Sequence, residues 1–175
     1  RCSDVLLENF ALETMERLEL GFDRLIGINP GLVYLQLKGF LSGPYEERRA
    51  LDEIVQMMSG LAYMTGPPGQ PLRAGASIVD IMGGMAGVIG VLAALRERDI
   101  YGKGQLVKAA LFETAVFAVG QHIVQFGINR QPLVPMSVPN RAWGIYDTFE
   151  SKEGKPMFIG VVTDTQWKKF CEVFD

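Results

Sequence analysis

Residues 4–37 read DVLLENFALETMERLELGFDRLIGINPGLVYLQL. Apolar runs at the two ends of this stretch, residues 4–7 and 32–37, predict two strands. The segment between them has the spacing of helices, which Gly21 and the turn signal at 29–31 interrupt. A strand, helices and a second strand within about 35 residues are typical of a βαβ unit. The sequence therefore predicts an α/β fold.

The rest of the chain continues this alternation of helices and strands. We expect helices at 51–63, 78–98, 112–127 and 165–174, and strands at 106–111, 143–149 and 156–162. Three prolines, Pro132, Pro135 and Pro139, fall within residues 129–142, and this stretch is predicted to be a linker. The linker separates the α/β segment from the last strands and helix.

The composition limits the classes of function. The chain has 175 residues, of which 48% are hydrophobic and 21% charged, and its net charge is −3. These values are ordinary for a soluble globular protein and exclude one that binds nucleic acid by bulk positive charge. Cys2 and Cys171 lie at opposite ends and His122 is the only histidine, so the chain lacks the ligands of a classical zinc site. We expect no metal, and we interpret His122 as a packed or interface residue.

Residues 78–95 form the most apolar stretch and require a membrane test. The stretch contains a GxxxG spacing, Gly83 to Gly87, which occurs in paired membrane helices. Against a membrane span, Asp80 lies inside the stretch, where a carboxylate is costly, and basic residues flank only one end. Glycines also allow close packing in soluble helices. We therefore predict a buried helix of a soluble protein and no membrane association.

Asp80 itself allows two interpretations. It falls near the predicted start of a helix, where free N–H groups and the helix dipole favour a negative charge. A carboxylate in that place is often only a helix-terminal residue. Alternatively, Asp80 is a nucleophile with free access, because Gly83 and Gly84 lack side chains one turn later. A carboxylate can attack an activated acyl group and form a covalent intermediate.

Other residues are weaker candidates for a site. Asp52 follows a charged loop and is either an acid or base near Asp80 or a solvated capping residue. Asn9 and Phe10 follow the end of a predicted strand, where α/β sheets bind ligands. The arginines are either phosphate ligands or surface charges: Arg17, Arg48, Arg49 and Arg73. The sequence has no glycine-rich phosphate-binding motif after a strand.

Taken together, the motifs resemble a known family. They are DVLLENF at 4–10, TMERL at 14–18, INPGLVY at 28–34, GF at 39–40, GPY at 43–45, MSGL at 58–61, Asp80 and GKGQ at 102–105. In this order and spacing they resemble the family III CoA-transferases, also called the CaiB–BaiF family. That group includes formyl-CoA and carnitine CoA-transferases and the α-methylacyl-CoA racemases. The resemblance covers nearly all of the chain and weakens after Asn129.

The resemblance implies a fold and an assembly. Family members have a large Rossmann-like α/β domain joined to a small α+β domain, and two chains interlock as a homodimer. By this resemblance, residues 1–128 belong to the middle of the large CoA-binding and catalytic domain. Residues 129–142 match the linker, and 143–175 the start of the small domain. We therefore expect the chain to be an internal part of a longer, cytoplasmic protein.

The resemblance also implies a reaction. Asp80 matches the family's catalytic aspartate, which attacks an acyl-CoA thioester and expels CoA to give a mixed anhydride. CoA then returns to form an aspartyl thioester, and an acceptor carboxylic acid takes the CoA by the reverse steps. Acyl-CoA and carboxylic acids are thus the expected substrates, with no tightly bound cofactor. The implied CoA contacts are Asn9, Phe10, Arg17 and Arg49, and Asp52 matches an acidic position flanking the transferase site.

Two departures from the family pattern bear on the reaction. The racemases have a histidine as acid/base partner directly before an acidic residue, and here Leu51 holds that place before Asp52. The formyl transferases have a glycine-rich loop after the linker, where this chain has VPNRAWG at 138–144. These differences favour transfer over racemisation and disfavour formyl or oxalyl substrates. The alternatives are an acyl-CoA racemase or isomerase, and an inactive fragment that at most binds CoA.

Overall fold

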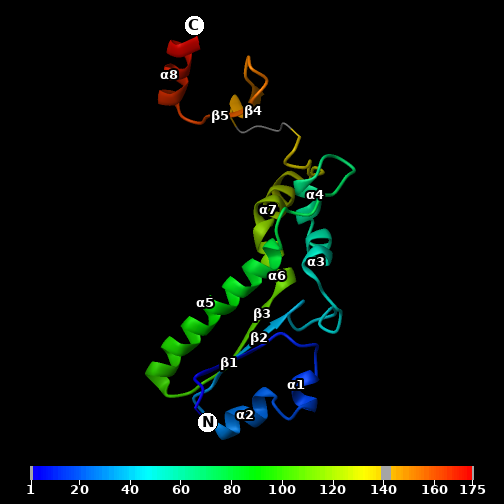
Figure 1. The fold of residues 1–175 in the computed structure, drawn as a ribbon, viewed down its shortest axis with the longest axis vertical. Coiled ribbons are helices and arrows are strands. Elements are labelled where there is room, and N and C mark those ends of the chain that lie inside the picture. The colour runs from blue at the N-terminus through cyan, green and yellow to red at the C-terminus, as the bar shows by residue number, and fades with distance from the viewer. Residues whose placement is uncertain (1, 139–142, 175) are drawn as a thin grey trace. The chain divides into compact units, whose positions relative to one another are not determined.

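The computed structural model describes residues 2–138 and 143–174 (Figure 1). The chain divides into two compact units, residues 1–135 and 136–175. The first unit contains the strands β1 to β3 and the helices α1 to α7. The second contains β4, β5 and α8.

A three-stranded parallel sheet forms the centre of the first unit. Its strands are β1 (Val5–Glu8), β2 (Val33–Lys38) and β3 (Leu106–Ala110), in the order β1-β2-β3. Each strand lies within one residue of the range predicted from its apolar run, and the parallel pairing confirms the α/β class. The central strand β2 is the best buried of the three, because it has neighbours on both sides and helices on both faces.

Two short helices pack on one face of this sheet. They are α1 (Thr14–Arg17) and α2 (Phe22–Ile28), and Met15 and Phe22 pack around Tyr34 of β2. The helical spacing before Gly21 therefore extends beyond the four residues that form α1. Glu13 and Glu19 adopt positive φ angles of 64° and 60°, which stop helical propagation on either side of α1.

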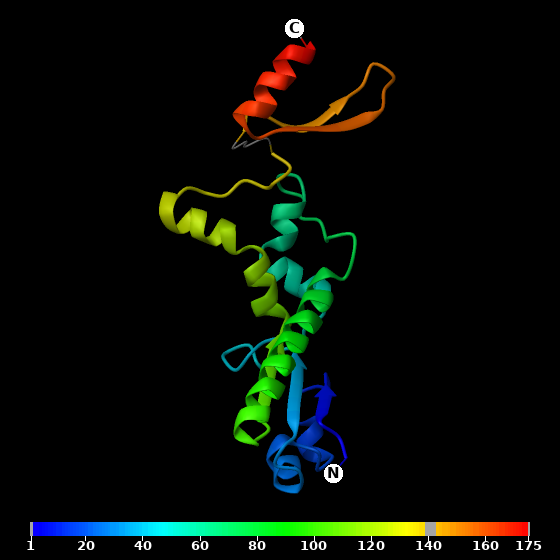
Figure 2. The same ribbon diagram turned by 90° about the vertical axis from the view of Figure 1, so that its left-hand side faces the viewer.

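The long helix α5 (Ile78–Tyr101) covers the opposite face and runs along β2 and β3 (Figure 2). Glycines bring it close to the sheet: a methyl group on Gly87 would lie 3.0 Å from Leu35, and one on Gly90 2.6 Å from Val107. Near the end of α5, Arg98 donates to the carbonyl of Gly31 at the amino end of β2. The first turn of α5 therefore lies toward the carboxyl edge of the sheet.

Helices α3, α4, α6 and α7 complete the first unit. The helix predicted over 51–63 is divided into α3 (Asp52–Met58) and α4 (Leu61–Thr65), because Gly60 takes a left-handed φ of 84°. The helix predicted over 112–127 is likewise divided into α6 (Leu111–Ala118) and α7 (Gly120–Asn129), which are bent by 59°. Val55 of α3, Val79 of α5 and Ala115 of α6 form a second buried cluster.

The prediction that α5 is buried is correct for one face only. Its glycine face packs on the sheet, whereas Ile81, Met85 and Ile89 are more than half exposed. By length and composition α5 could cross a membrane, as could α6 and α7 together if they formed one bent span. These are the candidates within 2–138 and 143–174, and core helices of soluble proteins pass the same test.

The second unit begins with an antiparallel hairpin. Strands β4 (Ile145–Glu150) and β5 (Pro156–Val161) pair around a turn, and α8 (Asp164–Phe174) follows. The backbone N–H of Gln166 donates to the Thr163 hydroxyl at 3.2 Å, so Thr163, and not the adjacent Asp164, supplies the cap of α8. Residues 139–142, which belong to the segment VPNRAWG at 138–144, lie outside the described residues.

Candidate functional site

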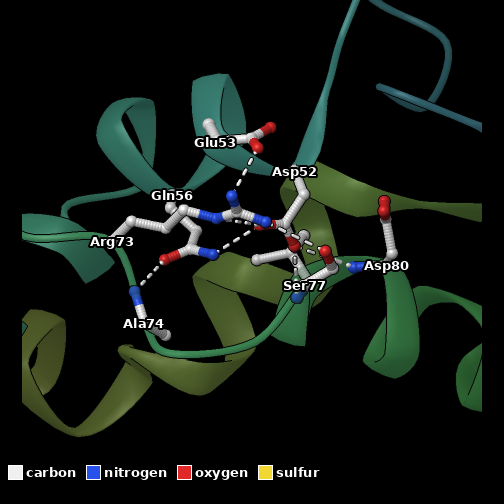
Figure 3. Close-up of polar contacts among 8 residues, drawn as sticks. Asp52, Glu53, Gln56, Arg73, Ala74, Ser77 and Asp80 are labelled. Carbon is white, nitrogen blue, oxygen red and sulfur yellow. Dashed lines mark hydrogen bonds and ion pairs between the residues drawn. The ribbon is translucent and has the colours of Figure 1, made fainter.

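Asp80 is the third residue of α5, at the end of the helix nearest the carboxyl edge of the sheet. Its side chain is exposed. In Figure 3 the carboxylate of Asp80 points away from the polar network around Asp52, whereas its backbone nitrogen is joined to Asp52. The position matches the predicted helix terminus, so a helix-terminal carboxylate and an accessible nucleophile remain compatible descriptions of the same residue.

Asp52, which lies in helix α3, caps the first turn of helix α5. It is the first residue of α3, and only 3% of it is exposed. Its Oδ2 accepts hydrogen bonds from the backbone N–H groups of Val79 at 2.8 Å and Asp80 at 3.2 Å. These N–H groups belong to the second and third positions of α5, which an N-cap side chain normally satisfies. The N-cap residue Ser77 makes no such bond, and Asp52 takes its place.

The second Asp52 oxygen anchors a wider network (Figure 3). Gln56 donates to Oδ1 at 2.5 Å, and the Arg73 guanidinium lies 3.5 Å from the same oxygen. Gln56 in turn accepts from the backbone N–H of Ala74, and Arg73 donates to Ser77. The network therefore ties α3 to the loop before α5, and donors occupy both oxygens of the buried carboxylate.

The surroundings of Asp80 raise its pKa. Although the side chain is exposed, its partial desolvation at the start of α5 is the largest cause, and the negative charges of Asp52 and Glu53 act in the same direction. Arg73, which forms an ion pair with Glu53 at 2.7 Å, acts in the opposite direction. A carboxylate with a raised pKa is a stronger base and nucleophile once it is ionised. Perturbed carboxylates of this kind are frequent in active sites.

The two glycines after Asp80 differ in their roles. A methyl group on Gly84 would meet no atom within 4 Å, so the space beside Asp80 is open on that side. A methyl group on Gly83 would lie 2.9 Å from Leu111, so this glycine serves the packing of α5 against α6. The sequence interpretation that both glycines provide access therefore holds for Gly84 alone.

The pKa of Asp80 leads to a paired prediction on pH. A nucleophilic Asp80 must be ionised, so its reaction with an acyl-CoA should slow as pH falls through its pKa. Glu53→Gln removes a cause that raises this pKa and should move the acid limb to lower pH. Arg73→Met removes the opposing charge and should move the limb to higher pH. The measurement is the rate of covalent labelling of Asp80 against pH. Acid limbs that shift in the same direction in the two variants would contradict the assignment of the limb to Asp80.

The predicted CoA contacts are spread over three segments. Asn9 and Phe10 directly follow β1, at the carboxyl edge, and both are exposed. Arg17 ends α1, and Arg49 lies in the loop before α3; both are also exposed. Within the described residues, no hydrogen bond or ion pair joins Arg17, Arg49 or the α7 residue His122 to Asp52 or Asp80.

Three polar residues, one in α3 and two at the ends of strands, were not singled out from the sequence. Gln56 lies one helical turn after Asp52, and that spacing is a signal for a side-chain pair. Glu8 and Lys38 are the last residues of β1 and β2, and the buried Glu8 needs a partner for its charge. A cavity of about 430 Å³ lies on the α1–α2 side of the sheet. Its lining includes Lys38 but neither Asp52 nor Asp80.

In parallel α/β units ligands bind at the carboxyl edge of the sheet, and the first turn of α5, with Asp80, lies toward that edge. A sequence profile described as CoA-transferase family III matches residues 1–175. The chain therefore belongs to CoA-transferase family III, which the resemblance had indicated.

Individual relatives agree with this assignment. The chain is 37% identical over 172 residues to the beta subunit of succinyl-CoA–L-malate CoA-transferase from Chloroflexus aurantiacus, covering 93% of this chain and 41% of that protein. It is 30% identical to succinate–glutarate CoA-transferase from Agrobacterium fabrum, covering 99% and 44%. A crystal structure of a CaiB/BaiF family protein from Brucella suis superimposes with a TM-score of 0.83 at 31% identity, covering 98% and 46%. The chain thus spans less than half the length of these relatives.

Proposed function

We propose that the protein containing this chain is a CoA-transferase that moves CoA between carboxylic acids, with Asp80 as the nucleophile. The observation that carries the proposal is the position of Asp80. Its backbone is fixed by the buried Asp52, its side chain is exposed beside the open space at Gly84, and its pKa is raised. Family membership supports the same activity.

The proposed reaction uses the carboxylate in two attacks. An Asp80 oxygen attacks the thioester carbonyl, the carbon–sulfur bond breaks, and CoA leaves as a thiolate, which gives an aspartyl–acyl anhydride. The thiolate then attacks the Asp80 carbonyl of the anhydride, releases the donor acid as a carboxylate and forms an aspartyl thioester. An acceptor carboxylate repeats these steps in reverse and departs as the new acyl-CoA. No redox or metal chemistry is needed for the atoms to balance.

Within this proposal Asp52 is a positioning residue. Its two oxygens receive the helix N–H groups, Gln56 and Arg73, so it orients Asp80 through the backbone and does not shuttle a proton. This differs from the acid or base role considered from the sequence. Asn9, Phe10, Arg17 and Arg49 are proposed to contact CoA, since Asn9 and Phe10 lie at the ligand-binding edge of the sheet.

Other features of the whole protein are also proposals. We propose a cytoplasmic homodimer in which residues 1–128 belong to a Rossmann-like large domain, 129–142 to a linker and 143–175 to a small domain. The names of two relatives, which specify succinyl-CoA with L-malate and succinate with glutarate, make short dicarboxylic acids the first substrates to test.

Mass spectrometry of the full-length protein tests the proposal. The protein is incubated with acyl-CoAs that include succinyl-CoA, and reactive aspartyl species are trapped with hydroxylamine. We expect a hydroxamate on the peptide that contains Asp80, and the productive thioester identifies the donor. Exchange of the substrate α-proton without any label on Asp80 would contradict transfer and favour a racemase. CoA binding without label or exchange would leave only a binding role.

A further inference from the structure

A buried ion pair lies at the carboxyl edge of the sheet, apart from the Asp52 network. Glu8 is the last residue of β1 and is 2% exposed, and Lys38 is the last residue of β2. Lys38 Nζ lies 2.7 Å from Glu8 Oε1 and donates to Oε2 at 2.8 Å. Burying such a pair costs desolvation energy that its attraction often fails to recover. Stability alone is therefore a weak explanation for it.

The Glu8–Lys38 pair forms hydrogen bonds with both polar backbone groups of Phe10. Phe10 donates its N–H to Glu8 Oε2 at 2.8 Å, and its carbonyl accepts from Lys38 Nζ at 2.7 Å. The Phe10 residue is nevertheless 53% exposed. The backbone of an exposed aromatic residue is thus fixed by two charged groups, at the edge where parallel sheets bind ligands. An exposed aromatic ring on a fixed backbone is a suitable surface on which a nucleobase can stack, because less backbone entropy is lost on binding.

We propose that Glu8 and Lys38 are positioning residues that hold the Asn9–Phe10 turn in the conformation that receives the adenine of acyl-CoA. The inference rests on the proposed function for the identity of the ligand. It assigns binding, and not catalysis, to the pair, because the pair contacts neither Asp80 nor Asp52 among the described residues. Loss of the pair should therefore weaken CoA binding and leave the chemistry at Asp80 intact.

Two variants of the full-length protein test this role. Lys38→Met frees the Phe10 carbonyl but leaves Glu8 buried and unpaired, which destabilises the fold. The double variant Glu8→Gln with Lys38→Met removes both charges, and the new amide oxygen still accepts from the Phe10 N–H. We expect the double variant to raise the KM for acyl-CoA about 10-fold, the scale of one lost base–aromatic stack, with kcat within about twofold.

A matched control is Lys108→Met. Lys108 lies on the neighbouring strand β3 and pairs with Ser42 and Glu46, so its loss leaves Phe10 untouched. We expect its KM to equal that of the unmodified protein. Unfolding curves of all variants identify any that fail to fold, and affinity for CoA itself is measured by calorimetry.

The outcomes separate this inference from the proposed function. Suppose that Asp80 becomes labelled in the unmodified protein and that the folded double variant keeps its KM and CoA affinity. The positioning role is then overturned, and the proposed transferase function stands. If the unmodified protein binds CoA without transfer and the double variant loses that affinity, the role stands and the transferase fails. If the unmodified protein does not bind CoA, both are overturned.

Discussion

Replacement of Asp80 with alanine is expected to lower the rate of CoA transfer by at least about 10³-fold in the full-length protein. The variant loses the atom that attacks the thioester, so no covalent intermediate can form. CoA affinity should change little, because the proposed nucleotide contacts lie on other segments. The measurement is kcat with the substrate pair identified by labelling, together with calorimetric titration of CoA.

Asp99→Ala is the matched control for this prediction. Asp99 lies near the other end of α5 and is also exposed, so the change removes one carboxylate from the same helix. We expect its kcat to match that of the unmodified protein. An Asp80→Ala variant that turned over as fast as the Asp99→Ala variant would refute the nucleophile and leave Asp80 as a helix-terminal carboxylate.

Replacement of Asp52 with alanine should reduce the free energy of unfolding by about 3 kcal/mol. The change leaves the N–H groups of Val79 and Asp80 without an acceptor and removes the partner of Gln56. Each lost hydrogen bond lowers the free energy of unfolding more in the interior than at the surface, because water does not replace the missing acceptor there. Chemical denaturation measures the effect, and kcat should fall as well because the first turn of α5 is no longer held.

The neighbouring residue supplies the control for Asp52. Glu53 carries the same charge and pairs with the same Arg73, but its side chain is 48% exposed. Glu53→Ala should change the free energy of unfolding by less than about 1 kcal/mol, as is typical of exposed ion pairs. Equal losses for the two variants would show that the burial of Asp52 adds nothing, and would remove its positioning role.

Local sequence predicted regular elements well and their interruptions poorly. The strands of the sheet follow from apolar runs of the right length, and the start of α5 at Ile78 follows from the change to an apolar pattern. The breaks at Glu13, Glu19 and Gly60 were missed, because helical spacing continues across them while the backbone φ turns positive. Tertiary packing decides such positions, and residue spacing carries little information about it.

The sequence by itself determined which residue was the strongest candidate for chemistry. Asp80 is the one carboxylate in a long apolar stretch, and that isolation is visible without a structure. The α/β class and the resemblance to a CoA-transferase family were also readable along the chain. All of these depend on neighbours within a few residues or on motif order.

Only the tertiary structure showed how the candidate site is held. Asp52 caps a helix that begins 26 residues later, and Lys38 donates a hydrogen bond to Phe10, 28 residues earlier. The sequence around Asp52 or Lys38 does not indicate which residue will be its partner. A buried carboxylate can accept a hydrogen bond from any donor that the fold brings within about 3 Å. The parallel sheet supplies that proximity by bringing the ends of distant strands to one edge, which is why the fold and not the spacing determines the site.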